Sequence, residues 1–344
     1  MTEPPKVSFI MPVLNAAGII ENCLKSIRRQ DYPQDRIEIL VGDAGSKDGT
    51  SDLVLKYGGQ VFPDNGRNIE DGKKAALLHA TGNYIVFIDA DNEITHPDYI
   101  RLAVDALSKH PEAFGVESYY LPSPRMTSFC AYLTHLLHIS DPVAWMMSIR
   151  PVFLGRDGDV ERWSFPEGSL AYPVGSNGFV FRRSELDLVN AREQYSDTHT
   201  SVRLIQATGK RQWLRIRGRG VHHYYVATLG EFTKKRQRAT CHFLDMTKEY
   251  GFSWTERKPR LPAWAACAWC GTIVLPSFQM VAGLIRTGDL RWLWHPFASL
   301  ASVWGVATGW WIYKRRGGDK KLIHSLQPRQ TLKSESEEEP PKKK

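Results

Sequence analysis

The feature that most constrains the fold is a regular alternation of strand-like and helix-like segments in the first hundred residues. Short apolar runs rich in β-branched residues predict strands at residues 7–13, 37–41, 60–62 and 84–89. Apolar residues at helical spacing predict helices between them, at residues 20–27, 50–57 and 69–80. Such alternation favours an α/β fold whose mostly parallel sheet is covered by helices on both faces.

Polar clusters follow the first, second and fourth predicted strands. Their members are Pro12, Val13 and Asn15; Asp43, Gly45 and Ser46; and Asp89, Ala90 and Asp91. Ligands of open parallel sheets bind beyond the carboxyl ends of the strands, so we expect the clusters to share one rim. Two carboxylates one residue apart suit a Mg²⁺ or Mn²⁺ ion that also contacts a phosphorylated ligand. Each cluster alone has the composition of an ordinary turn, and only their convergence predicts a site.

Three segments carry a family resemblance: SFIMPVLNAAGIIENCLKSI, EILVGDAGSKDGT and GNYIVFIDADNE. In this order and spacing they resemble the family 2 glycosyltransferases, which have the GT-A fold. The resemblance is close over residues 7–107 and looser to about residue 238, through VGSNGFVFRRSEL. It departs from the usual motifs at Ala16 and Ala44, where many members carry acidic residues.

The resemblance implies roles for the residues at the rim. A nucleotide-sugar would be bound by Pro12, Val13, Asn15, Asp43, Gly45, Ser46, Asp89 and Ala90. Asp91 would bind the Mg²⁺ or Mn²⁺ ion that bridges the two phosphates. Glu93 and His222 are further candidate metal ligands, because some relatives place an acidic residue and a histidine at these positions.

The second half of the catalytic domain is expected to bind the acceptor. The resemblance implies that a loop beside the donor sugar is formed by Gly175, Ser176, Asn177 and Gly178. Asp197 would be the general base that takes the proton of an acceptor hydroxyl, although an N-terminal helix cap is the ordinary role of such an aspartate. His199 is a rival base.

The expected function is metal-dependent, inverting transfer of a sugar from a nucleotide-sugar to a hydroxyl of a membrane-associated acceptor, such as a lipid-linked glycan. One alternative uses a polyprenyl phosphate as acceptor, which needs no base. A non-catalytic nucleotide-sugar-binding membrane module is a second alternative, against which Asp89, Asp91 and Asp197 argue. A processive polysaccharide synthase is less favoured, because two helices cannot build a channel.

The C-terminal third contains two runs without a charged residue, 23 residues long at 263–285 and 22 long at 292–313. Their length predicts a transmembrane hairpin at residues 261–316, with buried or in-plane helices as the alternative that Pro276 and Pro296 keep open. Lys and Arg flank the pair, so the positive-inside rule predicts a cytoplasmic catalytic domain on a cell membrane.

The chain is accordingly divided into a catalytic domain at 1–255, the hairpin and a disordered tail at 320–344. Within the catalytic domain, residues 1–110 form the nucleotide-sugar half and 111–255 the acceptor half. The net charge of +8 comes without any nucleic-acid-binding motif, so we expect no nucleic-acid partner. The five cysteines have irregular spacing and predict no disulfide framework.

Overall fold

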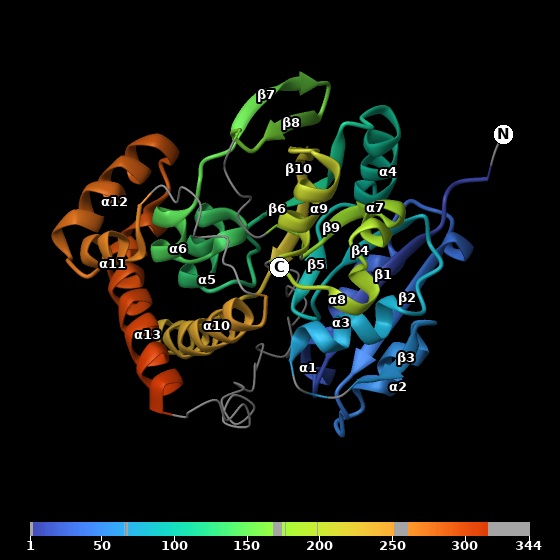
Figure 1. The fold of residues 1–344 in the computed structure, drawn as a ribbon, viewed down its shortest axis with the longest axis horizontal. Coiled ribbons are helices and arrows are strands. Elements are labelled where there is room, and N and C mark those ends of the chain that lie inside the picture. Colours follow the sequence, from blue (N-terminus) through green and yellow to red (C-terminus); the bar gives the residue numbers. More distant parts are fainter. Residues whose placement is uncertain are drawn as a thin grey trace, which may run out of the picture.

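The computed structural model describes residues 3–64, 66, 68–167, 174–175, 177–197, 199–250 and 261–315. Its N-terminal part is a parallel sheet in the order β3-β2-β1-β4 (Figure 1). The strands are β1 (Val7–Val13), β2 (Ile37–Asp43), β3 (Gln60–Pro63) and β4 (Tyr84–Phe87). The helices are α1 (Ala17–Arg28), η1 (Gln34–Arg36), α2 (Thr50–Lys56), α3 (Ile69–Leu77) and α4 (Tyr99–Lys109). The strands and helices predicted here are confirmed to within three residues at each boundary.

Beyond β4 the sheet continues as β9-β6-β10-β8-β7, and β5 pairs with β10. These strands are β5 (Asn92–Ile94), β6 (Ala113–Tyr120), β7 (Val152–Asp157), β8 (Val160–Ser164), β9 (Phe179–Arg182) and β10 (Gln212–His223). Among the described strands five of the nine pairings are antiparallel, so the expectation of a mostly parallel sheet is wrong for this half. One cause is local: a tight turn through Gly158, at φ 58°, joins β7 to β8, and such a turn can only produce an antiparallel hairpin.

Both faces of the sheet are buried. Along β1, Phe9 and Met11 belong to one hydrophobic cluster with helices α1 and α4, whereas Ile10 belongs to a second cluster on the other face. The second cluster also takes in residues of α3 and of α7 (Arg183–Leu188), α8 (Ala191–Gln194) and α9 (Thr200–Thr208). The α/β architecture with helices on both faces is therefore confirmed.

Helix α3 packs against the sheet through glycines. A Cβ atom on Gly42 of β2 would lie 2.0 Å from the carbonyl oxygen of Gly72, and one on Gly72 would lie 2.9 Å from Pro12 Cβ. Neither position has room for a side chain. The glycine that weakens the helical pattern of α3 thus allows the helix to lie directly on the carboxyl-terminal ends of β1 and β2.

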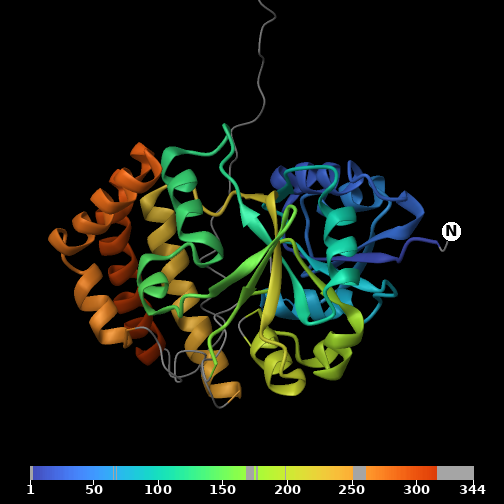
Figure 2. The same cartoon turned by 90° about the horizontal axis from the view of Figure 1, so that it is seen from above.

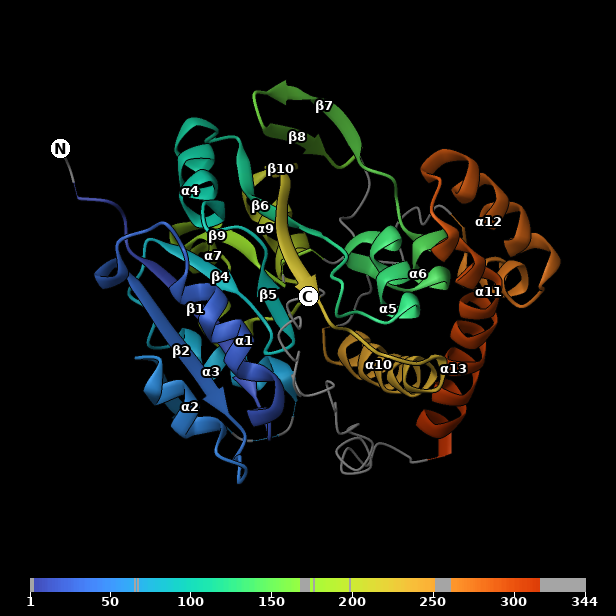
Figure 3. The same cartoon turned by 180° about the vertical axis from the view of Figure 1, so that it is seen from behind.

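A group of helices lies beside the sheet, at the left of Figure 1 and again separated from β1–β4 when the molecule is seen from above (Figure 2). It contains α5 (Ser128–Leu133), η2 (Thr134–Ile139), α6 (Pro142–Met147), α10 (Leu229–Tyr250), α11 (Ala263–Cys270), α12 (Val274–Thr287), η3 (Leu290–Trp294) and α13 (His295–Arg315). Phe129 and Tyr132 of α5 share a hydrophobic core with Phe232 of α10, Trp292 of η3 and Ala298 of α13. The predicted hairpin is therefore packed against the second half of the chain, as the view from behind also shows (Figure 3).

The two uncharged runs differ from the expected pair of straight helices. The first is broken into α11 and α12, whose axes differ by 81°. Pro276 and Pro296 fall in the first turns of α12 and α13, where proline is tolerated, instead of interrupting a helix. Within the described residues, no single helix combines the length and apolarity that a membrane crossing requires, and only the bent pair α11–α12 reaches them jointly.

Cys267 and Cys270 are free and lie in α11, where Cys270 packs in an apolar cluster. Residues 251–255, residue 316 and the tail at 320–344, which the predicted domain division includes, lie outside the described residues.

Candidate active site

The loop after β2 is organised by the carboxylate of Asp43. Its Oδ1 accepts hydrogen bonds from the amides of Gly45 (3.1 Å) and Ser46 (2.9 Å) and from Ser46 Oγ (2.7 Å). Its Oδ2 accepts one from Ser51 Oγ (2.7 Å). Burial opposes the charge, but these donors outweigh it and lower the pKa of Asp43. This predicted donor-binding residue thus shapes its own loop.

Asn15 ties the loop after β1 to the loop after β2. Its φ of 50° lies in the left-handed region, which asparagine tolerates. Its amide donates to Ser46 Oγ at 2.9 Å, and its Oδ1 accepts from the amide of Lys47 at 3.0 Å. In the parallel ladder Pro12 and Val13 pair with residues 42 and 43. The first two predicted clusters are therefore in direct contact.

The turn 89–91 brings the third cluster to the same edge of the sheet. Strand β4 ends at Phe87, and the amide of Ile88 still donates to the carbonyl of Ile10, at 3.0 Å. Asp91 then accepts a backbone hydrogen bond from Tyr224 at 3.0 Å, which attaches the turn to the end of β10. The side chains of Asp89 and Asp91 keep 21% and 12% of their surface exposed, so a ligand can reach both.

His223, and not His222, faces the second aspartate of this turn. His223 Nε2 lies 3.7 Å from Asp91 Oδ2, whereas His222 Nδ1 lies 2.9 Å from the carbonyl oxygen of Leu121. The two histidines are neighbours in β10, and successive side chains of a strand point to opposite faces. The structure therefore favours His223 over the predicted His222 as a metal ligand.

Glu93 has a partner of its own. Its Oε2 is ion-paired with Arg125 Nη2, and Tyr224 Oη lies 3.5 Å away. A metal ion would have to compete with that guanidinium for the carboxylate. The predicted role of Glu93 as a ligand has less geometric support than that of Asp91.

Asp91 and His223 fit the divalent cation that the family resemblance implies. Ligand atoms about 2.1 Å from one octahedral ion are about 3 to 4 Å apart, as these two side chains are. Burial lowers the pKa of His223, although Asp91 acts in the opposite direction, and the neutral imidazole is the form that binds metal. Among the residues described, no three His, Cys, Asp or Glu side chains converge on a metal position. This suits Mg²⁺ or Mn²⁺, which take few protein ligands together with substrate phosphates.

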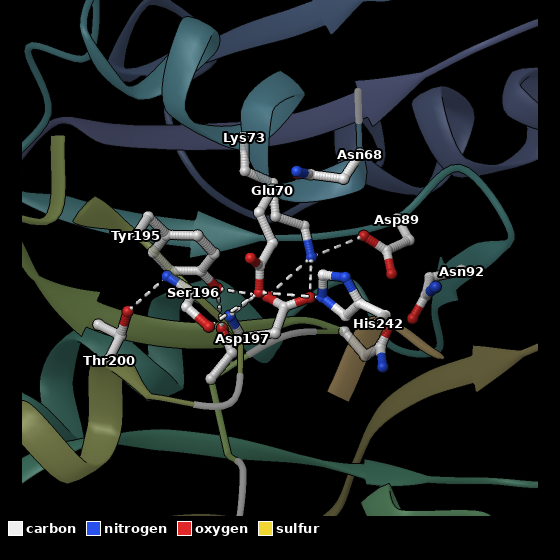
Figure 4. A network of polar contacts seen from close by, with 12 residues as sticks. Asn68, Glu70, Lys73, Asp89, Asn92, Tyr195, Ser196, Asp197, Thr200 and His242 are labelled. Carbon is white, nitrogen blue, oxygen red and sulfur yellow. Dashed lines mark hydrogen bonds and ion pairs between the residues drawn. The ribbon is translucent and has the colours of Figure 1, made fainter. Parts of the chain in front are cut away.

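Asp197 lies beside Asp89, with one lysine between them (Figure 4). Lys73 Nζ contacts Asp89 Oδ1 at 3.0 Å and the two carboxylate oxygens of Asp197 at 3.0 and 2.8 Å. Tyr195 Oη donates to Asp197 Oδ1 at 2.7 Å. Glu70 Oε1 accepts a hydrogen bond from the backbone amide of Asp197 at 3.0 Å. The predicted base is thus held next to a predicted donor residue.

Two alternatives at Asp197 can be compared with the structure. The residue at the cap position of α9 is His199, and the carboxylate of Asp197 contacts Lys73 of α3 and Tyr195 instead, so the helix-cap reading is wrong. His199, the rival base, is completely buried, with Nδ1 3.3 Å from Ser196 Oγ. An acceptor can approach Asp197, whose side chain is 25% exposed.

The glycine-containing loop before β9 adopts backbone conformations that need glycine. Gly175 and Gly178 have φ of 130° and 87°, and a Cβ on Gly178 would lie 2.8 Å from Val221. Asn177 donates from Nδ2 to Tyr120 Oη at 2.5 Å. Tyr195 Oη lies 3.1 Å from the carbonyl oxygen of Gly175, which attaches this loop to the one that carries Asp197. Ser176, the other predicted member, lies outside the described residues.

Sequence reasoning missed Glu70, Lys73 and Lys235. Glu70 and Lys73 share the buried face of α3 with Ala76 and Leu77, and charged residues at the apolar positions of a helix were the available signal. Lys235 of α10 donates a hydrogen bond to the carbonyl oxygen of Tyr225 at 3.1 Å. Burial lowers the pKa of Lys235, and the negative charges of Asp91 and Asp89 offset only part of this effect. No local pattern in α10 indicated that Lys235 lies within electrostatic reach of the rim.

The comparison with family models gives one match. Residues 8–124, about a third of the chain, match the family described as Glycosyl transferase family 2.

Curated relatives match a similar stretch. A glycosyltransferase named AglE from Haloferax volcanii is 28% identical over 110 residues, which are 30% of this chain and 36% of that protein. A GalNAc(5)-diNAcBac-PP-undecaprenol beta-1,3-glucosyltransferase from Campylobacter jejuni is 30% identical over 121 residues, 32% of this chain and 38% of that protein. The matched region thus spans well under half the length of these relatives.

A solved structure extends the likeness to the rest of the fold. The mannosyltransferase PcManGT from Pyrobaculum calidifontis, in complex with GDP-Man and Mn²⁺, superposes with a TM-score of 0.52 at 18% sequence identity. The superposition covers 90% of this chain and 88% of that one. At this identity the likeness concerns the fold alone, and it reaches past residue 124.

Proposed function

Since the chain belongs to glycosyl transferase family 2 through residues 8–124, we propose that it transfers a sugar from a nucleotide-sugar to a hydroxyl group of a membrane-associated acceptor. One observation carries the proposal: Asp89, Asp91 with His223, and Asp197 meet at the carboxyl ends of β4 and β10. A donor contact, a metal position and a base are the three parts that such a transfer needs.

The proposed reaction follows from these positions. A Mg²⁺ or Mn²⁺ ion, when bound, would neutralise the negative charge that develops on the departing diphosphate. Asp91 and His223 would hold that ion, and Asp89 would orient the donor. Asp197 would take the proton of the acceptor hydroxyl. The oxygen of that hydroxyl would form a bond to the anomeric carbon of the sugar while the bond between this carbon and the diphosphate breaks. Attack opposite the leaving group would invert the anomeric centre.

The choice of a hydroxyl acceptor over a polyprenyl phosphate rests on the surroundings of Asp197. Its carboxylate is held by Lys73 and Tyr195, and its amide by Glu70. A site that only received an anionic phosphate would not need a carboxylate there, because the negative charges repel. A lipid-linked glycan is the acceptor class we favour, and the relative from Campylobacter jejuni, which is named for an undecaprenol-linked substrate, supports it.

The direct test is incubation of the full chain with a panel of UDP- and GDP-sugars and Mn²⁺, followed by measurement of released nucleotide. We expect slow, Mn²⁺-dependent hydrolysis of one donor, with water replacing the acceptor. Asp91→Ala should reduce this by about 10³-fold or more, because a metal supplies several kcal/mol of charge stabilisation. Full hydrolysis in that variant, or in excess chelator, would refute the metal role, and binding without hydrolysis would favour the non-catalytic alternative.

We also propose that α11–α13 attach the chain to the cytoplasmic face of an anionic membrane. Exposed apolar side chains follow helical spacing on α12 and on α13: Val274, Phe278, Val281 and Ile285; and Phe297, Leu300, Trp304 and Trp311. Residues 261–315 hold four Lys or Arg residues against one Asp, so the charge also favours anionic lipid. Each stripe occupies one face of a helix whose other face is packed, which supports in-plane contact better than the predicted spanning hairpin.

Flotation with phosphatidylglycerol vesicles tests this attachment. Wild-type chain should float with them and less with phosphatidylcholine vesicles, whereas Phe278→Glu with Ile285→Glu should stay in the dense fraction. Leu188→Glu is the matched control, since Leu188 is a similarly exposed residue of α7. Equal flotation of the double variant would refute the role of the α12 stripe.

Thr287→Cys distinguishes a membrane-spanning hairpin from helices that lie in the plane of the membrane. A spanning hairpin would shield the cysteine from maleimide added on the side of the catalytic domain, and in-plane helices would leave it accessible.

A further inference from the structure

Arg238 is a half-buried cation of α10 that has no counter-charge among the described residues. Its Nε is completely covered and has no hydrogen-bond partner. Burial and the neighbouring guanidinium of Arg236 both lower the pKa of Arg238, and no acidic group acts in the opposite direction. Because the burial of an unpaired charge is costly, a cation kept in such a position is suited to an anion that a ligand supplies.

The carboxylates around α10 are engaged by other groups. Asp89 and Asp197 face Lys73, Asp91 faces His223, Glu70 faces His242, and Asp141 faces Arg236. Glu231 and Asp245 lie on the same side of α10 as Arg238, but each is seven residues away, which is about 10 Å along a helix. The anion that would balance Arg238 is therefore not found within the part of the chain that the structure describes.

Helix α10 is packed against α13 through the face that does not carry Arg238. The approach is close: a Cβ atom on Gly305 of α13 would lie 2.5 Å from Arg236 Cβ, and one on Gly309 would lie 2.7 Å from the carbonyl oxygen of Gln237. The opposite face of α10 is turned away from α13 and is the one on which Arg238 lies.

This second face of α10 lines the rim of the site. Lys235, Arg238 and His242 follow one another at spacings of three and four residues, which places them on one side of a helix. Lys235 is near enough to Asp91 for the two charges to interact. His242 Nε2 lies 3.7 Å from Glu70 Oε1, beside the loop of the proposed base (Figure 4). Arg238 thus lies between the metal end and the base end of the site.

The place of α10 in the molecule indicates where such an anion comes from. The helix lies between the sheet and α11–α13, the helices proposed to contact the membrane (Figures 1 and 2). In a lipid-linked glycan the diphosphate likewise lies between the lipid and the sugar. The donor has a diphosphate of its own, but that group belongs at the metal position of Asp91 and His223, where Lys235 is the nearer cation of this face.

We propose that Arg238 binds the diphosphate group of a lipid-linked acceptor. The proposal rests on the proposed function, because it takes the acceptor to be lipid-linked. The planar guanidinium can donate two parallel hydrogen bonds to phosphate oxygens, which fixes the orientation of the acceptor as well as its position. It also keeps the negative charge of the acceptor on α10, apart from the carboxylate of Asp197, so a base and an anionic substrate can be used in one site.

The test is calorimetric titration of the full chain with geranyl diphosphate, a soluble prenyl diphosphate, in saturating Mn²⁺ with UDP and with GDP, so that the donor position is already occupied. Wild type should bind this probe. Arg238→Gln should weaken binding by about 10-fold or more, the loss expected for a charge-assisted hydrogen bond, and Arg238→Lys by less. Lys234→Gln is the matched control, because it removes the same charge from an exposed position one turn earlier in α10, and it should leave the affinity unchanged. Geraniol, which lacks the diphosphate, should bind far more weakly.

The melting temperature gives a second readout. Without ligand, Arg238→Gln should melt at or above wild type, because it removes an unpaired cation. Geranyl diphosphate should raise the melting temperature of wild type more than that of the variant. A lower melting temperature of the variant without ligand, or its failure to fold, would show an internal partner and overturn the proposal.

The titration has outcomes that overturn the proposal as well. These are no binding of geranyl diphosphate to wild type, equal weakening in Lys234→Gln, and geraniol binding as tight as that of the diphosphate. Binding that disappears when either nucleotide is added would assign Arg238 to the diphosphate of the donor and would also overturn it. A wild type that binds the probe but hydrolyses no donor would instead count against the proposed function.

Discussion

The loop after β2 and the loop that carries Asp197 both present a carboxylate at the rim, but they are held in different ways. Asp43 accepts from residues two, three and eight positions further along the chain. Asp197 is held by Lys73 and Glu70, which are 124 and 127 positions away. The donor loop is held mainly by its own residues, with Asn15 as its contact to the loop after β1, whereas the acceptor loop depends on α3 in addition to its own Tyr195.

This difference bears on what each loop contributes. A loop that is closed by its own hydrogen bonds keeps its shape regardless of the rest of the site, so substitutions in it should act mainly on stability. A loop that is held by a distant helix is sensitive to small displacements of that helix, and positioning errors are costly in catalysis. Substitutions there should act mainly on turnover.

The largest effect that tests this contrast is expected for Asp197→Asn. The variant preserves shape but cannot accept a proton, so turnover with a hydroxyl acceptor should fall by about 10²–10⁴-fold while donor affinity barely changes. A membrane extract can supply the acceptor. Turnover within a few-fold of wild type would favour a polyprenyl phosphate acceptor and would remove Asp197 from the mechanism.

An intermediate effect is expected for His223 at the end of β10. This residue is far in sequence from the turn at Asp91 that it faces. His223→Ala should weaken Mn²⁺ binding in the presence of nucleotide by about 10–100-fold, a loss of the size seen when groups around a metal are removed. His222→Ala should leave Mn²⁺ affinity unchanged, because that ring lies against Leu121. Electron paramagnetic resonance of free Mn²⁺ measures both, and the reverse order of effects would return His222 to the metal position.

The smallest effect is expected for Asp43→Asn, and it should appear in stability. The amide nitrogen cannot accept the bonds of the loop, which should lower the free energy of unfolding by about 1–3 kcal/mol at pH 7. Because the pKa of Asp43 is lowered by folding, its contribution is present above about pH 4 and is lost as pH falls below that value. Urea unfolding at pH 7 and at pH 3 should therefore show a difference between the two proteins that shrinks in acid. Equal stability at pH 7 would contradict the organising role of Asp43.

The sequence predicts the parallel half well because its signals are local. The spacing of apolar residues, the turn residues and the polar residues at strand ends are all signals within a few positions of one another. Strands β1–β4 form where these signals predict them. The predictions weaken where partners are distant. The mixed half of the sheet depends on pairings such as β9 with β4 and β6, which no short window encodes.

The same reason explains the residues that were missed or misassigned. Nothing near Lys73 in the chain reveals that Asp197 is its partner, and the choice between His222 and His223 depends on which face of β10 meets the turn at Asp91. The length of the two uncharged runs predicts a separate hairpin for the C-terminal helices. In the structure these helices pack against Phe129, Tyr132 and Phe232, more than fifty residues earlier.

The contact between Gly42 and Gly72 has a genetic consequence. A methyl group at either position has no space to occupy, so α3 would be lifted from the sheet and Lys73 withdrawn from both aspartates at once. Even alanine, the mildest of replacements, should therefore behave as a loss-of-function allele here, although neither glycine carries a functional group. Revertants of an allele at Gly72 should arise from neighbours that make room for the new methyl group, for example by shortening Pro12, and not from changes among the charged residues of the site.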